Sequence, residues 1–191
     1  MADPSHEEEF IVQRWKEAEA AYHSDKKIAL SIFHELVEYD VPEALDEIGR
    51  IYESFGGSEN EQRAIDYYQR SIEKIDSVYG HIGLGRICLN RGDTGKAVVH
   101  LEKGVAKEPG ALFGLGIAHS RGIGDGSPDL AKAKHYYQLA TDRGHIRAAI
   151  HLAKIMIRHG PRLRGLYLLI RSAYQSISAG IDEENHPRMT I

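Results

Sequence analysis

Two short sequence motifs recur along this chain with a period of about 34 residues. The first is a Leu or Ile followed by Gly or Ala, with the small residue at positions 49, 85, 116 and 153. The second is a small residue that opens an amphipathic segment, at positions 29, 64, 97, 133 and 165. Two interleaved motifs with one period are typical of a helix–turn–helix unit copied along a chain. We therefore expect a stack of similar helical units.

The small residues and the helix boundaries support this interpretation. A Gly or Ala lets two helix backbones approach closely, and a large residue three or four positions later fills the gap beside it. Prolines 42, 109, 128 and 161 mark expected helix starts, with Ser127 as the N-cap before Pro128. Ser58–Glu61 has the form of a capping box, and Asp25 and Asp93 are further expected N-caps. Glycines 56, 92, 122 and 160 mark positions where a left-handed residue should follow a helix.

The sequence predicts an all-α fold, a right-handed α-solenoid of about five antiparallel helix pairs. The predicted pairs are 5–22 with 25–38, 42–54 with 59–75, 79–90 with 94–106, 109–121 with 128–142, and 145–158 with 161–178. Residues 1–40 are expected to form a divergent or capping pair, and residues 41–178 the repeats. Residues 179–191 are expected to form a flexible tail.

The repeated segments resemble the Sel-like repeat, a relative of the tetratricopeptide repeat. Residues 111–144 are most similar, through Leu115-Gly116, Gly122-Ile-Gly124, Asp129-Leu-Ala-Lys132-Ala133, Tyr136-Tyr137, Ala140 and Gly144. Residues 44–72 and 80–105 match through fewer positions, and the two terminal pairs depart further from the pattern. The resemblance covers about 40–178. It implies an adaptor or scaffold, since family members are typically adaptors in bacterial signalling, secretion and envelope processes or in eukaryotic protein quality control.

Charge is unevenly distributed along the 191 residues. The net charge is −4, but residues 1–76 hold 19 acidic and 8 basic residues (net −11), whereas residues 77–191 hold 9 and 16 (net +7). The single cysteine, Cys88, excludes an intramolecular disulfide and a multi-thiolate metal site. Together with an acidic N-terminus and apolar runs too short to span a bilayer, it favours a cytoplasmic protein without membrane insertion.

By analogy with tetratricopeptide repeats, the first helix of each pair should line a concave binding face. The inferred face runs from acidic positions such as Asp46 to basic ones near the C-terminus, and we expect it to bind a partner segment that is acidic where it meets residues 143–171. The candidate partner-binding residues are Arg50, Tyr79, Arg86, Asn90, Phe113, Arg121, Arg147, Lys154 and Arg158. Tyr79 and Phe113 would supply apolar anchors. The alternative is a solvated helix face that only keeps the solenoid soluble.

Other function classes receive less support from the residues. The seven Lys and Arg of 143–181, without any acid, could bind nucleic acid or an anion, but the chain as a whole is acidic and the stretch has few aromatic residues. The eleven histidines form no metal-ligand pattern, and no nucleophile motif indicates an enzyme. We therefore expect no metal and no cofactor. A regulatory subunit that modulates a partner enzyme remains the alternative function.

The last predicted helix carries apolar residues nearly all round, whereas a terminal solenoid helix normally has a polar outer face. Either the tail with Met189 and Ile191 covers it, or another chain does, in which case a partner or a homodimer forms there. The candidate interface residues are Leu166, Leu169, Ile170 and Tyr174.

Overall fold

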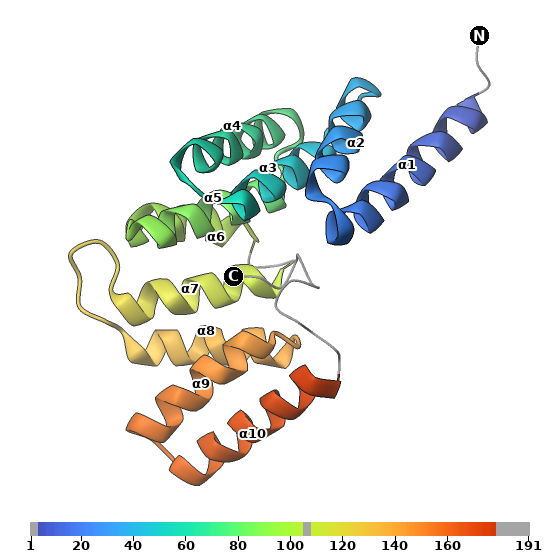
Figure 1. The fold of residues 1–191 in the computed structure, drawn as a ribbon. Coiled ribbons are helices and arrows are strands. Elements are labelled where there is room, and N and C mark those ends of the chain that lie inside the picture. The colour runs from blue at the N-terminus through green and yellow to red at the C-terminus, as the bar shows by residue number, and fades with distance from the viewer. Residues whose placement is uncertain (1–3, 105–107, 179–191) are drawn as a thin grey trace. The chain divides into compact units, whose positions relative to one another are not determined.

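The computed structural model describes residues 4–104 and 108–178 of the chain. These ranges contain ten helices and no strand (Figure 1). The helices are α1 (Pro4–Ser24), α2 (Lys26–Glu38), α3 (Ala44–Phe55), α4 (Ser58–Ile75), α5 (Val78–Arg91), α6 (Thr94–Gly104), α7 (Pro109–Arg121), α8 (Leu130–Asp142), α9 (Ile146–His159) and α10 (Arg162–Ser178). All ten predicted helices are confirmed. The predicted tail, 179–191, lies outside the described residues.

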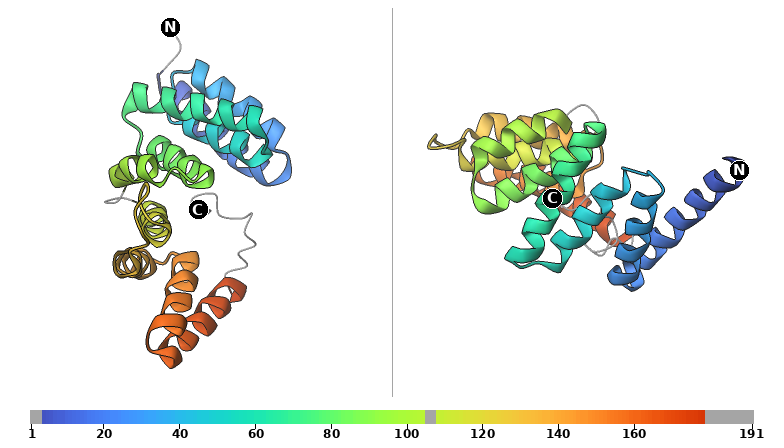
Figure 2. Two further views of the ribbon diagram at one scale, coloured as in Figure 1. Left: turned by 90° about the vertical axis from the view of Figure 1, so that its left-hand side faces the viewer. Right: turned by 90° about the horizontal axis from the view of Figure 1, so that it is seen from above.

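The chain divides into two compact units, unit 1 (residues 1–83) and unit 2 (residues 84–191), with the division inside α5. Within each unit, helices pack mainly on their neighbours in the sequence: α1 on α2 and α3 on α4, then α7 on α8 and α9 on α10. Figure 2 shows these antiparallel pairs from two further directions. Packing between sequence neighbours is the arrangement of an all-α solenoid, as the repeat period predicts.

The close approach of helices in unit 1 depends on Tyr68 of α4. Its ring is 2% exposed and lies against two glycines, Gly49 of α3 and Gly83 of α5. A Cβ at Gly49 would lie 2.7 Å from the ring, and a Cβ at Gly83 would lie 2.4 Å from it, so neither position has room for a methyl group. Tyr68 stands four residues after the small residue Ala64 of the second motif. Its ring fills the space beside Gly49 of the first motif, which confirms the prediction that a large side chain at this spacing fills the gap.

The same arrangement recurs in unit 2. Leu101 of α6 lies between Gly85 and Gly114, where a Cβ would approach its side chain to 2.7 and 2.8 Å. Tyr137 of α8 lies against Gly116 of α7, where a Cβ would approach its ring to 2.4 Å. The gap at Gly49, Gly85 and Gly116 is thus filled by the second helix of the same pair, and the gap at Gly83 and Gly114 by the second helix of the preceding pair. These contacts explain why both motifs share one period.

Helix N-termini differ from the predictions in detail. Asp25 caps α2 as predicted, because its carboxylate accepts a hydrogen bond from Lys27 N at 2.8 Å. The N-cap of α8 is Asp129, which accepts from Lys132 N at 2.9 Å, so the prediction of Ser127 was wrong. The predicted capping box at Ser58 was also wrong, because Gly57 is the N-cap and Ser58 is already helical. At α8, the carboxylate of Asp129 caps the helix in place of the Ser127 hydroxyl, because a charged carboxylate interacts favourably with the exposed N–H groups of a helix start.

Three of the four predicted left-handed glycines are confirmed. Gly56, Gly92 and Gly122 have φ of +69°, +83° and +92°. Gly160 has φ −155°, which is extended backbone, so that prediction was wrong. The chain leaves α9 directly towards Pro161 and α10, and this short connection uses an extended rather than a left-handed residue.

Each unit has its own apolar core. The unit 1 cluster is Ala18, Tyr22, Ala29, Ile32, Phe33, Leu36, Ala44, Ile48 and Ile51. The unit 2 cluster is Leu112, Phe113, Ala133, Tyr137, Ala140, Ala148, Leu152 and Met156. The helices of each unit are therefore held by their own buried side chains.

One carboxylate is buried in unit 1. Asp46 of α3 is 7% exposed, although the sequence analysis places it on the exposed binding face. Its Oδ2 accepts a hydrogen bond from the Ser77 hydroxyl at 2.5 Å, and that hydroxyl oxygen in turn accepts from Gly80 N at the start of α5. Burial raises the pKa of Asp46 to about 6, while the hydrogen bond from Ser77 opposes the rise. Asp46 is thus a structural link between α3 and α5.

Candidate binding surfaces

Three predicted partner-binding cations lie together on α9. Arg147, Lys154 and Arg158 are all exposed. Lys154 and Arg158 follow Arg147 by 7 and 11 residues, which at 100° per residue places each within about 20° of Arg147 around the helix axis. The three cations therefore share one face of the helix. Among the described residues, no ion pair joins any of them to a carboxylate. Their charge is therefore available to a ligand.

Arg121 of α7 extends this positive surface. Its Nη1 donates a hydrogen bond to the carbonyl oxygen of Leu89 at 2.7 Å, which fixes the guanidinium in place. His151 lies among these cations: burial lowers its pKa most, followed by the charges of Lys154, Arg147 and Arg121. Three cations that each disfavour the charged form of the same imidazole indicate a positive field at this place. We call the exposed surface of Arg121, Arg147, Lys154 and Arg158 the α7–α9 face.

Phe113 supports this face from below. Its ring is 1% exposed, so the prediction that it anchors a partner at the surface is wrong. It packs against His151 with 5.2 Å between ring centroids, and the Arg147 guanidinium lies 5.8 Å from the ring centroid. Phe113 faces the core because α8 and α9 both pack over α7. Its contribution to the face is to hold Arg147 and His151 in position.

The other predicted partner-binding residues are less available. Arg50 of unit 1 is half-buried, is paired with Glu47 on the preceding turn, and stacks 3.8 Å from the Tyr22 ring centroid. Its charge is therefore used within the chain. Tyr79 is 40% exposed and Arg86 is half-buried, and both interact within the chain. Asn90 is exposed.

An apolar stripe runs along α10. It consists of five exposed side chains, from Leu163 at 85% exposure to Tyr174 at 71%, and all five fall within about 100° of one another around the helix. The members are Leu163, Leu166, Tyr167, Ile170 and Tyr174. Leu166, Ile170 and Tyr174 were predicted as interface residues. Leu169, also predicted, is half-buried and lies off the stripe, because its position on the helix turns it away from the other three.

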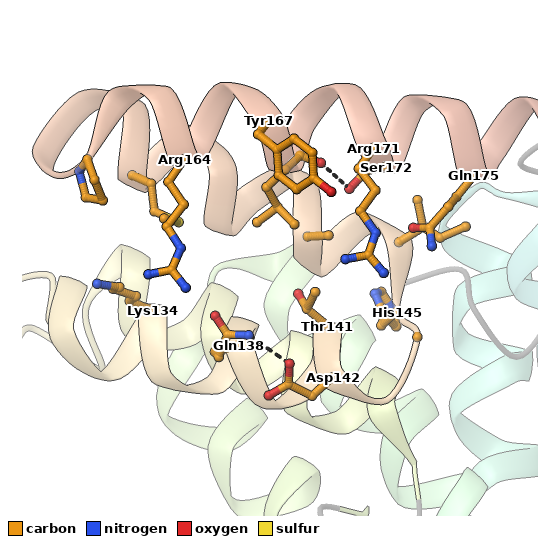
Figure 3. Close-up of a pocket in the computed structure, with 16 residues that line it drawn as sticks. Lys134, Gln138, Thr141, Asp142, His145, Arg164, Tyr167, Arg171, Ser172 and Gln175 are labelled. Carbon is orange, nitrogen blue, oxygen red and sulfur yellow. Dashed lines mark hydrogen bonds between the residues drawn. The ribbon is translucent and has the colours of Figure 1, made fainter.

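A pocket lies beside this stripe, between α8 and α10 (Figure 3). Its volume is about 960 Å³, and its basic lining residues are Lys134, Arg164 and Arg171. Arg164 and Arg171 belong to the basic stretch 143–181 of the sequence, whereas Lys134 lies outside it and was not predicted as a site residue. The one signal in the sequence is the spacing of seven residues, which puts both arginines on the same side of α10.

Metal-binding groups and the single cysteine are two further kinds of candidate site. They contain no group of three or more His, Cys, Asp and Glu side chains that could hold a metal ion. Cys88 is half-buried, and burial followed by the nearby charge of Asp93 raises the pKa of its thiol, which works against a reactive thiolate. None of the described helices has both the length and the apolar character needed to cross a bilayer. The cytoplasmic location stays a prediction.

Comparison with known proteins identifies the repeat. The Sel1 repeat family model matches residues 42–76 and 109–145, which include α3 with α4 and α7 with α8. The search of curated proteins found no statistically significant match to the chain.

Solved structures of other repeat proteins share the fold. A Sel1 repeat protein from Oxalobacter formigenes is 17% identical, with a TM-score of 0.67 over 86% of this chain and 73% of that one. MamA from Desulfovibrio magneticus RS-1, from residue 41 to its end, is 19% identical, with a TM-score of 0.60 over 88% and 96%. A protective antigen of uropathogenic Escherichia coli, c5321, with an SLR fold, is 19% identical, with a TM-score of 0.60 over 89% and 39%. At these identities the likeness shows the fold alone.

Proposed function

We propose that this chain, in which two segments match the Sel1 repeat, is a non-enzymatic scaffold for protein–protein interaction, and that its α7–α9 face binds an acidic segment of a partner protein. Solenoids built from helix pairs offer extended surfaces to partners. The proposal therefore rests on a face whose four cations form no ion pair with a carboxylate among the described residues.

The observation that carries this proposal is the convergence of Arg121, Arg147 and Lys154 around His151. Each of the three charges lowers the pKa of the same imidazole, so their fields overlap at one place. An acidic segment that lies along this face would be attracted by the charges of all three cations. Complementary charge of this kind gives a partner both its orientation and a fast association rate.

Two cations of the face are held in position before a partner arrives. Arg121 is fixed by its bond to the Leu89 carbonyl, and Arg147 lies over the buried ring of Phe113. Ordering a long side chain on binding costs about 0.5–1.5 kcal/mol, and positioning within the free protein reduces that cost. Such positioning favours a specific acidic segment over a diffuse counter-ion cloud.

The proposal is tested by affinity capture of the tagged protein from its native cell lysate, after nuclease treatment. The variant R147E/K154E/R158E reverses the α9 part of the face. The control K16E/K27E/K103E reverses three exposed lysines on α1, α2 and α6, with the same change in net charge. We expect a stoichiometric protein that is captured by the wild type and the control and is lost with the α9 variant. Equal capture by all three proteins would contradict the proposal.

The nature of the captured molecule separates the remaining alternatives. If the partner is an enzyme whose turnover changes on binding, the chain is a regulatory subunit. If nucleic acid is recovered when nuclease is omitted, and binding falls steeply with salt, the positive surface is a nucleic-acid site and the scaffold proposal is wrong.

A further inference from the structure

The α8–α10 pocket is a second basic surface of unit 2, and it lies on the other side of α9 from the α7–α9 face. Ala149 and Met156 of α9 line the pocket, and their positions are about 180–200° around the helix from Arg147. The walls are α8, with its connection to α9, and α10 (Figure 3). A volume of about 960 Å³ is at the upper end of the range for ligand sites, which is about 300–1,000 Å³.

Basic side chains face one another across this pocket. Arg164 of α10 extends towards Lys134 of α8 (Figure 3). Arg171, two helical turns further along α10, extends towards His145. Among the described residues, none of the three cations forms an ion pair with a carboxylate. The one acid of the lining, Asp142, accepts a hydrogen bond from Gln138 at 2.8 Å. Like charges that face one another repel unless an anion lies between them.

His145 adds an unpartnered donor at one end of the pocket. It is 1% exposed, and its Nδ1 accepts a hydrogen bond from Ala148 N at 3.1 Å, which caps α9. Burial lowers the pKa of His145 to about 4, so the ring is neutral at pH 7 and its proton is on Nε2. That Nε2 has no hydrogen-bond partner among the described residues. A buried donor without a partner is uncommon in folded proteins and calls for an acceptor.

We propose that the α8–α10 pocket binds an extended acidic peptide of a partner protein, with one carboxylate between Arg164 and Lys134 and a second between Arg171 and His145 Nε2–H. The two arginines are seven residues apart, which is about 10.5 Å along α10. In an extended polyproline-II segment, side chains three residues apart lie on the same side at about 9 Å. Two acidic residues in an i, i+3 pattern therefore match the two ends of the pocket.

The floor of the pocket favours a peptide over a small inorganic anion. Between the two charged ends the lining includes the apolar side chains of Ala149, Met156 and Leu168, while the α8 wall carries the polar Gln138 and Thr141 (Figure 3). A phosphate or sulfate ion would use only one end, whereas the residues between two acidic side chains of a peptide would cover the apolar floor. This site uses other side chains than the proposed α7–α9 face and lies on another side of α9, although the charge of Arg147 also acts on His145.

The test is fluorescence anisotropy with a fluorescein-labelled peptide that contains Glu-Pro-Ala-Glu, titrated with the full chain at 150 mM salt. The matched control peptide has Gln at both Glu positions. The variant R164Q/R171Q should weaken binding of the acidic peptide about tenfold, since it removes two charge-assisted contacts. The variant H145N should weaken it about threefold while keeping the helix cap, because Asn is a favoured N-cap residue.

Two further variants make the result specific to this pocket. K154E/R158E should bind the peptide as the wild type does, which separates this site from the α7–α9 face; Arg147 is left in place because its charge acts on His145. D182N/E183Q/E184Q is titrated in parallel, because the acidic residues at 182–184 could compete with the probe. In an NMR titration, the Nε2 resonance of His145 should shift as its N–H gains an acceptor.

Several results would overturn the proposal. One is equal affinity of the wild type and R164Q/R171Q for the acidic peptide, with no shift of the His145 Nε2 resonance. Another is absence of binding to both the wild type and D182N/E183Q/E184Q. Displacement of the peptide by millimolar inorganic phosphate as effectively as by unlabelled peptide would also overturn it, since the pocket would then be a site for any small anion.

Discussion

Gly116 offers a direct test of the packing that defines the repeat. A Cβ added at this position would lie 2.4 Å from Cε1 and 2.5 Å from Cδ1 of Tyr137, whereas carbon atoms in ordinary contact are about 3.5–4.0 Å apart. The ring would have to move by about 1 Å. It is 1% exposed and packs against Phe113 and His151, with centroid distances of 5.8 and 5.3 Å, so it has little space to do so.

The substitution Gly116→Ala therefore sets two effects against each other. Replacing Gly by Ala inside a helix is worth about 1 kcal/mol in helix propensity. Overpacking a tight core costs about 1–3 kcal/mol, and a rigid ring that must move by a full ångström lies near the upper value. We expect a net loss of about 2 kcal/mol in the free energy of unfolding, or a melting temperature roughly 10 °C lower for a unit of this size.

Gly95→Ala is the matched control within the same unit. Gly95 lies in α6, and the nearest heavy atom to an added Cβ is Asp93 Oδ1 at 3.8 Å. The same change should there stabilise unit 2 by about 0.5 kcal/mol. Urea unfolding followed by circular dichroism measures both variants. The reasoning is refuted if G116A proves as stable as G95A, or if adding Tyr137→Leu to G116A recovers none of the lost stability.

The remaining predictions concern a buried carboxylate and the apolar stripe of α10. Because the folded-state pKa of Asp46, about 6, is above its ordinary value of 3.8, the folded state binds a proton more tightly, and stability should fall as the pH rises from about 4 to 6. Asp46→Asn should remove this loss of about 3 kcal/mol. In urea unfolding, the free energy of unfolding of the variant relative to the wild type should therefore rise between about pH 4 and 6. A difference independent of pH would contradict the raised pKa of Asp46. We expect two copies of the chain to pair through the apolar stripe of α10. The variant L166D/I170D should then sediment as a monomer, while the control V99D, at an exposed position on α6, should sediment as the wild type does. Identical sedimentation of all three proteins would exclude this interface.

Much of the architecture follows from local sequence. The spacing of small residues predicts ten helices in five pairs because helix formation, capping and close approach depend on residues within one repeat. Asp25 caps its helix as predicted, since an N-cap needs only its own backbone. The shared orientation of Arg147, Lys154 and Arg158 is likewise fixed by helical geometry.

The burial and pairing of individual side chains depended on which face of each helix packs against a neighbouring helix. Phe113 and Asp46 were both placed on an exposed face by analogy, yet both are buried, because α9 covers α7 and the start of α5 covers α3. The charge of Arg50 is used by Glu47, a neighbour that the sequence places nearby but does not pair. Spacing within a helix gives the angles between its side chains, but not which of those angles meets a neighbour.

The sequence by itself determined the repeat, its helices and the positive charge of the C-terminal half. Only the tertiary structure decided where that charge is used. Arg164 and Arg171 share a side of α10 by their spacing, but they form a pocket only because α9 separates α10 from α8 and brings Lys134 and His145 to the opposite wall. Helical periodicity is a property of consecutive residues, whereas the gap between two helices is set by the side chains of a third helix that packs between them.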